Sequence, residues 1–256
     1  MGVIVAVGSQ IGRASQVNQD AVYAGPQLQV VAAGRGSGGD IAAAEVVEAM
    51  ARQVIRPSED ALNRAAATLW EERFRPRSPI MELALSAIDQ AHERLGRLKQ
   101  HDQRCTDATV WVTAIHWSGH ELALTHVGLC RAYLIRDGEI YQITHDFTLP
   151  RALPAPRFLD GTAAPDPDQS LRESRPGDRY ILCTRGFAPS IHDGPDLRII
   201  KEGASPADIV NRLMQAVQAN PAADDASCVV IDVMATETTV EPVTAGALAR
   251  LPRSCE

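Results

Sequence analysis

One glycine-rich run in the sequence has the spacing of a nucleotide-binding loop. The segment from Gly34 to Gly39 (GRGSGG) satisfies G-x-G-x-x-G, follows an apolar run and precedes a helical pattern. In a dinucleotide-binding unit, such glycines let the backbone approach a pyrophosphate at a helix N-terminus. A turn between a strand and a helix that needs positive φ is the commoner reason for such a run. We therefore keep this loop, together with Arg35, as an alternative site for a nucleotide or a small anion.

Two other arrangements have spacings that could support catalysis or metal binding. Cys130 and Arg136 have the C-x5-R spacing of cysteine-dependent phosphatases. That reaction needs a thiol at a helix N-terminus, whereas both residues lie in a strand-like run. His116, His120 and His126 surround one predicted hairpin and could be taken for zinc ligands, although histidines on a strand surface are far commoner. We expect neither arrangement to be a functional site.

Composition limits the class of protein. The chain has 256 residues, with 25 basic and 32 acidic side chains and a formal net charge of −7. Nucleic acids and anionic membranes attract a basic face, so we expect neither to be the main partner. The five cysteines are scattered without a C-x-x-C pair, which is typical of a reducing compartment. The apolar start, Met1 to Val7, lacks the basic region of a signal peptide and the length of a membrane span, so we expect a cytoplasmic protein.

Hydrophobic periodicity predicts both helices and antiparallel strands. Apolar residues recur at helical spacing over 41–55 and 79–98, and a further helix is expected over 206–218, with Ser205 as its N-cap. The Asp137-Gly138 pair between two alternating runs is a strong hairpin signal, which excludes an all-parallel sheet. Strands are expected at 3–7, 28–33, 109–116, 121–127, 131–136, 139–143, 179–183 and 228–234, with a weaker candidate at 171–174.

These elements indicate an α+β fold in which helices cover antiparallel sheets. We place one domain over residues 1–235. Residues 236–256 lack periodicity, so we expect them to be a disordered tail or a linker.

Five strings, in order along the chain, resemble signature segments of bacterial metal-dependent protein phosphatases of the protein phosphatase 2C, or PPM, type. In sequence order, they are NQDA at 18–21, VAAGRGSGG at 31–39, VGLCRAYL at 127–134, PGDRYILCTRG at 176–186 and DDASCVV at 224–230. The family counterparts are N-E-D-A/S, V-A-D-G-M-G-G, V-G-D-S-R-x-Y-L, G-D-R-x-L-L-C-S-D-G and D-N-x-T-V-V-V. The resemblance implies a four-layer α-β-β-α sandwich of two antiparallel sheets flanked by helices.

The resemblance also implies serine/threonine phosphatase activity with two Mn²⁺ or Mg²⁺ ions. Such hard cations need anionic oxygen ligands, so each ligand position is effectively restricted to Asp or Glu. Most of those positions carry other residues in this chain. The bridging Asp becomes Ala33, beside Gly34; two further Asp positions become Leu129 and Arg185; the Glu of N-E-D becomes Gln19; and the phosphate-gripping arginine becomes Ser15.

Three carboxylates remain as residual metal candidates. Asp20 matches the aspartate of N-E-D, Asp224 matches a metal ligand and is followed by Asp225, and Asp102 corresponds to an acidic residue linked to a third metal in bacterial members. We predict that Arg185 pairs with Asp224 and with Asp20, which replaces metal contacts by charge-assisted hydrogen bonds. Breaking such a pair when it is buried costs roughly 3–5 kcal/mol. The alternative is an Arg185 that faces solvent and leaves room for one metal.

The leading interpretation is a pseudophosphatase: a PPM-type domain that lacks most metal ligands, needs no cofactor and acts as a binding or regulatory module in Ser/Thr phosphorylation signalling. Its expected partner is a phosphoprotein or a kinase of the same pathway. The first alternative is an active serine/threonine phosphatase with a rearranged Mn or Mg site built from Asp20, Asp102, Asp224 and Asp225. The second alternative is a nucleotide- or anion-binding protein that uses the Gly34–Gly39 loop.

Overall fold

The computed structural model describes residues 1–13, 15–55, 78–145, 157–187, 200, 204–219 and 224–250. The strands are β1 (Gly2–Gln10), β2 (Asp20–Ala24), β3 (Leu28–Arg35), β4 (Thr109–Ser118), β5 (Glu121–Val127), β6 (Arg131–Arg136), β7 (Glu139–Gln142), β8 (Asp168–Glu173), β9 (Arg179–Cys183), β10 (Ala226–Met234) and β11 (Val243–Gly246). The helices are α1 (Gly39–Ile55), α3 (Pro79–His101) and α6 (Pro206–Ala219), with 3-10 turns η1 (Gln103–Cys105), η2 (Arg185–Phe187) and η3 (Leu248–Arg250).

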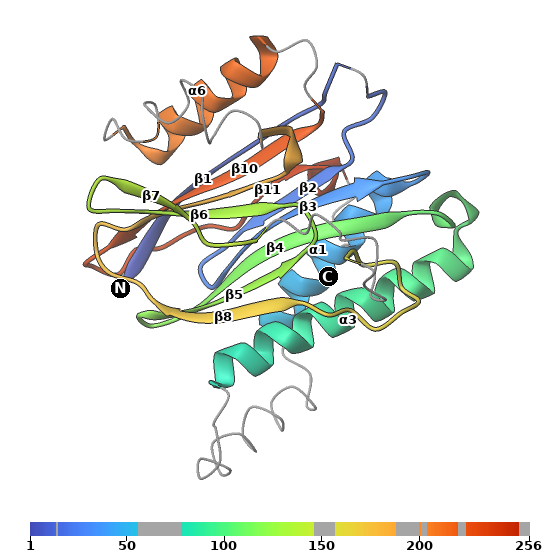
Figure 1. Cartoon of the computed structure of the whole chain (residues 1–256), viewed down its shortest axis with the longest axis horizontal. Coiled ribbons are helices and arrows are strands. Elements are labelled where there is room, and N and C mark those ends of the chain that lie inside the picture. Colours follow the sequence, from blue (N-terminus) through green and yellow to red (C-terminus); the bar gives the residue numbers. More distant parts are fainter. Residues whose placement is uncertain are drawn as a thin grey trace.

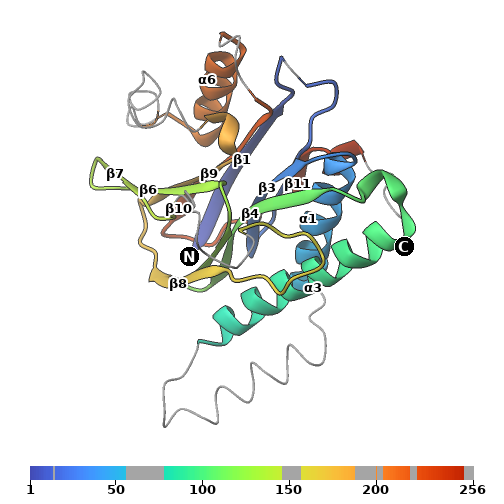
Figure 2. The ribbon, with the colours of Figure 1, turned by 45° about the vertical axis from the view of Figure 1, so that its right-hand side comes forward.

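The strands form two antiparallel sheets that face each other. One has the order β1-β10-β9-β6-β7 and the other the order β11-β2-β3-β4-β5-β8. Helix α6 covers the outer face of the first sheet, and α1 and α3 cover the outer face of the second (Figure 1 and Figure 2). The predicted α-β-β-α sandwich is therefore confirmed. No helix among the residues placed here is long and apolar enough to cross a membrane.

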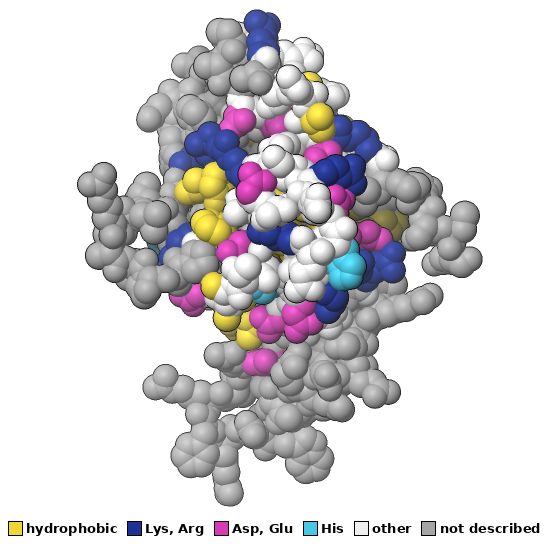
Figure 3. Space-filling view, turned by 90° about the vertical axis from the view of Figure 1, so that its right-hand side faces the viewer, with side chains coloured by type: hydrophobic (Ala, Val, Ile, Leu, Met, Phe, Trp, Pro, Cys, Tyr) yellow, Lys and Arg dark blue, Asp and Glu magenta, His cyan; other side chains and the backbone are white. Residues whose placement is uncertain are grey.

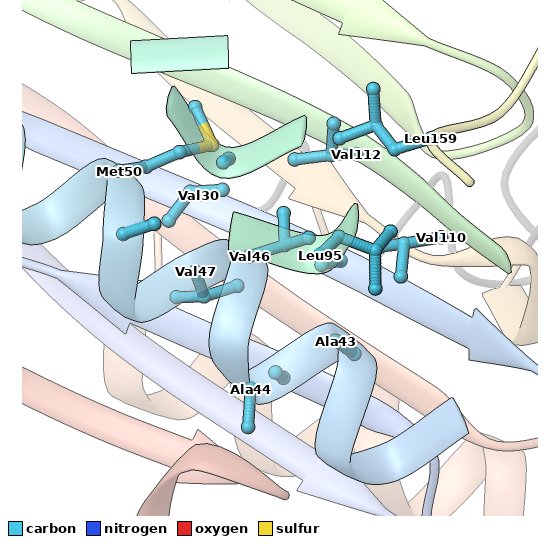
Figure 4. Close-up of a cluster of buried hydrophobic side chains, with 14 of the residues drawn as sticks. Val30, Ala43, Ala44, Val46, Val47, Met50, Leu95, Val110, Val112 and Leu159 are labelled. Atoms are coloured by element: carbon cyan, nitrogen blue, oxygen red, sulfur yellow. The ribbon is translucent and has the colours of Figure 1, made fainter. Parts of the chain in front are cut away.

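Three apolar layers hold the sandwich together. Between the sheets, side chains such as Val31, Tyr180 and Ile231 are buried. Between the second sheet and its helices, α1 points Val46, Val47 and Met50 toward β3, β4 and α3 (Figure 4). The many small side chains on α1 let its backbone approach the sheet closely, which tightens the packing. The third layer lies between α6 and the first sheet.

Local sequence signals explain the turns and helix ends that were predicted. Asp137 and Gly138 join β6 to β7 with positive φ values of 54° and 78°, as a two-residue hairpin turn of this composition requires. At the start of α6, the backbone N–H of Asp208 donates to the Ser205 hydroxyl at 3.2 Å, and that hydroxyl donates to the Asp208 carboxylate at 2.6 Å. Ser205 therefore is the N-cap that the sequence indicated.

The prediction that residues 236–256 form a disordered tail or a linker is wrong for the part that the structure describes. Strand β11 pairs with β2 from Val243 opposite Ala24 to Gly246 opposite Ala21. The Ala247 N–H then donates to the carbonyl of Asp20 at 2.7 Å, and Ala247 is buried. The ordering comes mainly from backbone pairing along the β2 edge, which hydrophobic periodicity cannot report. The domain boundary expected at residue 235 therefore falls inside the fold.

Candidate functional site

Strand pairing brings most of the predicted site residues to one end of the sandwich, where β2, β4 and β10 begin and β3 and β9 end. Asp20 lies directly opposite Ala33 in the β2–β3 pair. In the other sheet, Cys183 at the end of β9 lies opposite Cys228 in β10, so Thr184 and Arg185 lie near the start of β10. Figure 3 views this end of the molecule and shows acidic and basic side chains interspersed rather than separated by sign.

Asp20 is held in the interior by hydrogen bonds from the protein. Its side chain is buried, and Oδ2 accepts a 2.7 Å hydrogen bond from the Thr184 hydroxyl. Burial raises the pKa of Asp20 to about 7, although hydrogen bonds from Thr184 and Ser227 act in the opposite direction. The Thr184 hydroxyl therefore supplies a hydrogen bond that holds this buried carboxyl in place.

Asp224 lies between two guanidinium groups. Its Oδ2 accepts a hydrogen bond from Arg185 Nη2 at 2.8 Å and lies 3.4 Å from Arg35 Nη2. Partial burial acts to raise the pKa of Asp224, but the hydrogen bond from Arg185 and the charges of Arg35 and Arg185 hold it below its usual value. Asp224 is therefore an anion whose charge is already compensated by protein cations.

The predicted pairing of Arg185 with Asp224 is confirmed. The free-energy cost expected for breaking it, that of a buried pair, is wrong. The side chains of Arg185 and Asp224 are 47% and 39% exposed, so the pair is not buried. Pairs this exposed contribute about 0–1 kcal/mol rather than the cost expected of a buried pair. The predicted contact with Asp20 is not among the contacts of the placed residues, since the Asp20 carboxyl is bonded to Thr184 instead.

Arg35 was predicted only as part of the alternative anion site, and its pairing with Asp224 was missed. Its guanidinium carbon lies 5.1 Å from the centre of the Trp111 ring, a distance at which cation–π attraction operates. Trp111 lies directly opposite Ala33 in the β3–β4 pair. The sequence did give one sign of an unusual role, because Arg35 stands where the family string has methionine. The contact with Trp111 could not be predicted, because it depends on the pairing register of β3 and β4.

Asp225 and Gln19 form hydrogen bonds that hold neighbouring backbone segments in place. The Asp225 carboxylate accepts from the backbone N–H of Gly12 at 2.7 Å and of Gln19 at 2.8 Å. Gln19 donates from its side-chain amide to the carbonyl of Gly36 at 2.9 Å, and its own carbonyl accepts from Gly34 N–H at 2.9 Å. Together these bonds tie the segment before β2 to the start of β10 and to the glycine loop.

The remaining predicted positions supply no carboxylate to this cluster. Ser15 lies in the loop between β1 and β2, where its N–H donates to the carbonyl of Gly12 at 3.1 Å. Leu129 is partly buried in the turn between β5 and β6, after Gly128 with a φ of 99°. Neither side chain carries a charge, so neither adds an ionic group to this cluster.

Asp102 lies at the C-terminal end of α3 and is bonded to Arg104. Its carboxylate accepts from Arg104 Nη2 at 2.6 Å and from the backbone N–H of Arg104 at 3.0 Å. The side-chain hydrogen bond from Arg104 is the main reason that the pKa of Asp102 is lowered. The Asp102 carboxylate is therefore already paired with the guanidinium of Arg104, two residues along the chain.

These residues do not fit a pair of divalent cations. Within the described ranges, no three His, Cys, Asp or Glu side chains are grouped so as to hold a metal ion. Asp224 is bonded to Arg185, and Ala33, directly opposite Asp20 in the β2–β3 pair, offers no ligand atom. The carboxylates of the rearranged site predicted from Asp20, Asp102, Asp224 and Asp225 are likewise not grouped as a metal site among the described residues.

The glycine loop does not have the geometry of a dinucleotide site. Strand β3, which precedes it, is antiparallel to both of its neighbours, so the parallel sheet of such a fold is absent around it. The N–H of Ser37 donates to the Asp107 carboxylate at 3.2 Å. A Cβ added at Gly34 would lie 1.9 Å from the carbonyl oxygen of Gly39. The glycines therefore serve close backbone packing, and Asp107 places a negative charge where an anion would bind.

The cysteine and histidine arrangements are also explained by structure. Cys130 is buried, and burial raises the pKa of its thiol well above the usual value, so it is not a nucleophile. Arg136 instead donates to Asp178 at 2.7 and 2.6 Å.

The three histidines do not lie together as zinc ligands. His126 is paired with Thr113, and Thr113 and His116 are three residues apart on β4, so His116 and His126 lie on opposite faces of the sheet. His120 is exposed in the turn between the two strands.

Comparison with known proteins agrees with the observed fold. No protein-family model matches the chain. The serine/threonine protein phosphatase PstP of two Mycobacterium tuberculosis strains is 28% identical over 252 residues, which covers 90% of this chain and 45% of each relative. The chain thus spans less than half the length of the curated relatives that it matches.

Solved structures give the same result for the fold. The catalytic domain of PstP in complex with two manganese ions is 26% identical, with a TM-score of 0.75, and the alignment covers 91% of this chain and 99% of that domain. The PPM phosphatase MsPP of Mycobacterium smegmatis has a TM-score of 0.70 at 23% identity, covering 90% of this chain and 98% of that one, and supports the fold alone. The chain is therefore similar in sequence to the serine/threonine protein phosphatase PstP and similar in fold to PPM phosphatases.

Proposed function

We propose that this chain is a PPM-type phosphatase-like domain that recognises phosphorylated protein through arginines and does not hydrolyse it efficiently. The observation that carries the proposal is Asp224 between Arg185 and Arg35. In this proposal the domain works in the cytoplasm as a binding or regulatory module in Ser/Thr phosphorylation signalling. Its partner is a phosphoprotein or a kinase of the same pathway, and it requires no metal.

The argument against efficient hydrolysis is electrostatic. Phosphate-ester hydrolysis is among the slowest uncatalysed reactions, and the family supplies its nucleophile and charge stabilisation with two metal ions. Here a methyl group stands at Ala33, and a permanent cation stands at Arg185. A guanidinium repels a divalent cation and keeps its charge at any physiological pH. The chain therefore lacks the means to generate a hydroxide-like nucleophile in the family's way.

The argument for phosphate recognition rests on the same two arginines. A guanidinium can bind a phosphate group with two parallel hydrogen bonds, and arginine clusters are a recurrent means of recognising phosphorylated residues. Arg35 and Arg185 are 41% and 47% exposed, so their donors can be reached from solvent. The Asp224 carboxylate occupies the donors as an internal anion. We infer that a phosphoryl group displaces it, and that Trp111 keeps Arg35 oriented.

Hydrolysis can be measured directly with Mn²⁺ and p-nitrophenyl phosphate or a phosphothreonine peptide, with the PstP catalytic domain as the positive control. We expect turnover by this chain to be at least about a thousandfold lower, because loss of groups that stabilise the transition state has effects of this order. Turnover comparable to the control, dependent on Mn²⁺ and lost in Asp224→Ala, would overturn the proposal.

Binding can be measured by calorimetry with the same phosphothreonine peptide and its unphosphorylated form, in a metal-free buffer. Replacing Asp224 by Asn keeps the side chain's shape and removes its negative charge, so affinity for the phosphopeptide should rise by about tenfold. Arg185→Gln should lower it. These signs distinguish the proposal from a metal-ligand role for Asp224, in which the same change would weaken phosphate binding or leave it dependent on added Mn²⁺.

An active enzyme with a rearranged metal site is the second candidate. Its support is the similarity to PstP, whose catalytic domain was crystallised with two manganese ions, and the retention of Asp20 and Asp224 at the same end of the sandwich. Arg185 is half exposed, so it could swing outward and free Asp224 for one ion. Titration with Mn²⁺ by calorimetry would favour this candidate if a micromolar site appeared and disappeared in Asp224→Asn.

A further inference from the structure

The outermost strand of the six-stranded sheet, β8, has one open edge. It pairs with β5 over its whole length, and the part of the chain that the structure describes places no strand on its other side (Figure 1). The edge of β1, by comparison, is partly occupied, because the Val3 carbonyl accepts a 2.6 Å hydrogen bond from the Thr238 hydroxyl. An open edge is a template for pairing with a further strand.

The hydrogen-bond pattern shows which backbone groups of β8 face outward. Just beyond the strand, the N–H of Ser174 donates to the carbonyl of His120 at 2.8 Å. In an antiparallel pair every second residue directs its backbone groups to the partner strand. The residues of β8 whose N–H and C=O groups point away from β5 are therefore Gln169, Leu171 and Glu173. The Glu173 carbonyl accepts from Arg136 Nη2 at 3.1 Å, whereas no described residue bonds to the outward groups of Gln169 and Leu171.

The side chains of β8 carry opposite charges on one face. Arg172 lies opposite Leu122, which is buried between the sheets, so Arg172 and every second residue before it, including Asp168, point to that face. Among the described residues the Arg172 guanidinium bonds only to Ser170 Oγ, at 3.1 Å, and Asp168 is exposed. Leu171 points to the opposite face and is 42% exposed. One edge strand therefore presents a cation, an anion and an apolar side chain.

A second copy of the same strand complements these groups. When two copies of β8 pair antiparallel about a two-fold axis at Ser170, Gln169 of each copy lies opposite Leu171 of the other, and the two exchange both backbone bonds. The same register puts Asp168 of each copy directly opposite Arg172 of the other. Opposite charges in facing positions stabilise a strand pair, and here they meet twice. The two Leu171 side chains lie diagonally across from each other, so each covers apolar surface of the other.

We propose that the chain forms a symmetric dimer through β8, in which the six-stranded sheets of two copies join into one continuous antiparallel sheet. The register is set by the Asp168–Arg172 pairs and by the open backbone groups of Gln169 and Leu171. The Glu173 carbonyl, already bonded to Arg136, is not needed in this register. The dimer uses none of the residues of the proposed phosphate recognition, from which β8 is separated by β4 and β5 in the sheet.

Analytical ultracentrifugation of the full chain tests self-association. We expect a dissociation constant of about 10–100 µM, because a contact between two strand edges is small. Asp168→Arg and Arg172→Asp each turn both ion pairs into like-charge pairs, so each should raise the dissociation constant at least about tenfold. Arg97→Asp is the matched control, since it reverses the charge of an arginine on α3 that is 62% exposed, and it should leave self-association unchanged.

Mixing the two single variants is the decisive measurement. In a mixed dimer the aspartates of one variant face the arginines of the other, so the mixture should associate about as tightly as wild type does alone. This recovery also shows that both variants are folded. Hydrogen exchange reports on the backbone: at high protein concentration the amides of Gln169 and Leu171 should become protected, whereas those of Ser170 and Arg172, which face β5, should be protected at every concentration.

Three results would each contradict the proposed dimer. They are a chain that stays monomeric at about 1 mM, self-association that neither single variant weakens, and weakened association that does not recover in the mixture.

Discussion

Arg185 donates a hydrogen bond of 2.8 Å to Asp224 across the space between the end of β9 and the start of β10. The two residues lie 39 positions apart in the sequence and are brought together because β9 and β10 are neighbours in one sheet. The same carboxylate oxygen lies 3.4 Å from Arg35 Nη2, at the end of β3 in the other sheet. Protein cations from both sheets therefore converge on one carboxylate.

Metal binding should be recoverable by reversing two substitutions. In the double variant Ala33→Asp with Arg185→Asp, a bridging carboxylate is restored opposite Asp20 and the guanidinium is removed, so Mn²⁺ affinity measured by calorimetry should rise by at least about a hundredfold. Arg52→Asp, at an exposed position in the last turn of α1, makes an arginine-to-aspartate change away from the cluster and should not have this effect. Equal affinity in wild type and the double variant would contradict the assignment.

Asp20 should make stability depend on pH between about 4 and 7. Its pKa is raised by burial to about 7 in the folded chain, whereas an unfolded Asp titrates near 3.9. Below pH 4 the group is protonated in both states and carries no penalty. As pH rises toward 7, the unfolded chain releases the proton first, so folding loses up to roughly 4 kcal/mol relative to a non-titrating side chain.

The measurement for Asp20 is urea unfolding of wild type and Asp20→Asn at pH 4.5 and pH 8. An Asn oxygen can still accept the hydrogen bond from Thr184, so the variant isolates the effect of the charge. The variant should become more stable relative to wild type as pH rises. A difference that stays constant with pH would show that the Asp20 pKa is not raised.

Arg136 should be important for stability and not for phosphate binding. Its guanidinium forms bonds of 2.7 and 2.6 Å to Asp178, whose side chain is 2% exposed. Arg136→Met would remove both guanidinium bonds and leave that carboxylate buried without this counter-charge, at a cost of roughly 3–5 kcal/mol. Urea unfolding should show this loss, while Arg52→Met, which breaks an exposed pair with Glu48, should change stability little. Comparable losses in the two variants would be evidence against this role.

The contact between β11 and the backbone of Asp20 should be visible in a matched pair of glycine variants. Gly246 has a φ of +67°, and a Cβ there would lie 2.2 Å from the carbonyl oxygen of Asp20. Gly119 has a similar φ of +62° with nothing within 4 Å. Gly119→Ala should cost about 1–2 kcal/mol from backbone strain alone, and Gly246→Ala should cost clearly more by urea unfolding. Equal costs would mean that the β11 contact is not tight.

How much the sequence could predict depended on whether the signal was local. The Asp137-Gly138 turn, the Ser205 cap and the helices over 41–55 and 79–98 follow from residue type and period, and all are found in the structure. Strand β2 was missed, because its five residues are all buried and show no alternation. Strand β11 was missed for another reason: it is ordered by pairing with β2.

For the site, the sequence alone determined which chemical groups are present: a methyl at Ala33, a guanidinium at Arg185 and carboxylates at Asp20 and Asp224. Only the tertiary structure decided their protonation, their contacts and their exposure to solvent. Burial and the Thr184 hydroxyl set the pKa of Asp20, and register across β3 and β4 puts Trp111 beside Arg35. Exposure makes the Arg185–Asp224 pair weak rather than strong. Desolvation and distance govern electrostatic energies, and both depend on the packing of residues far apart in the chain.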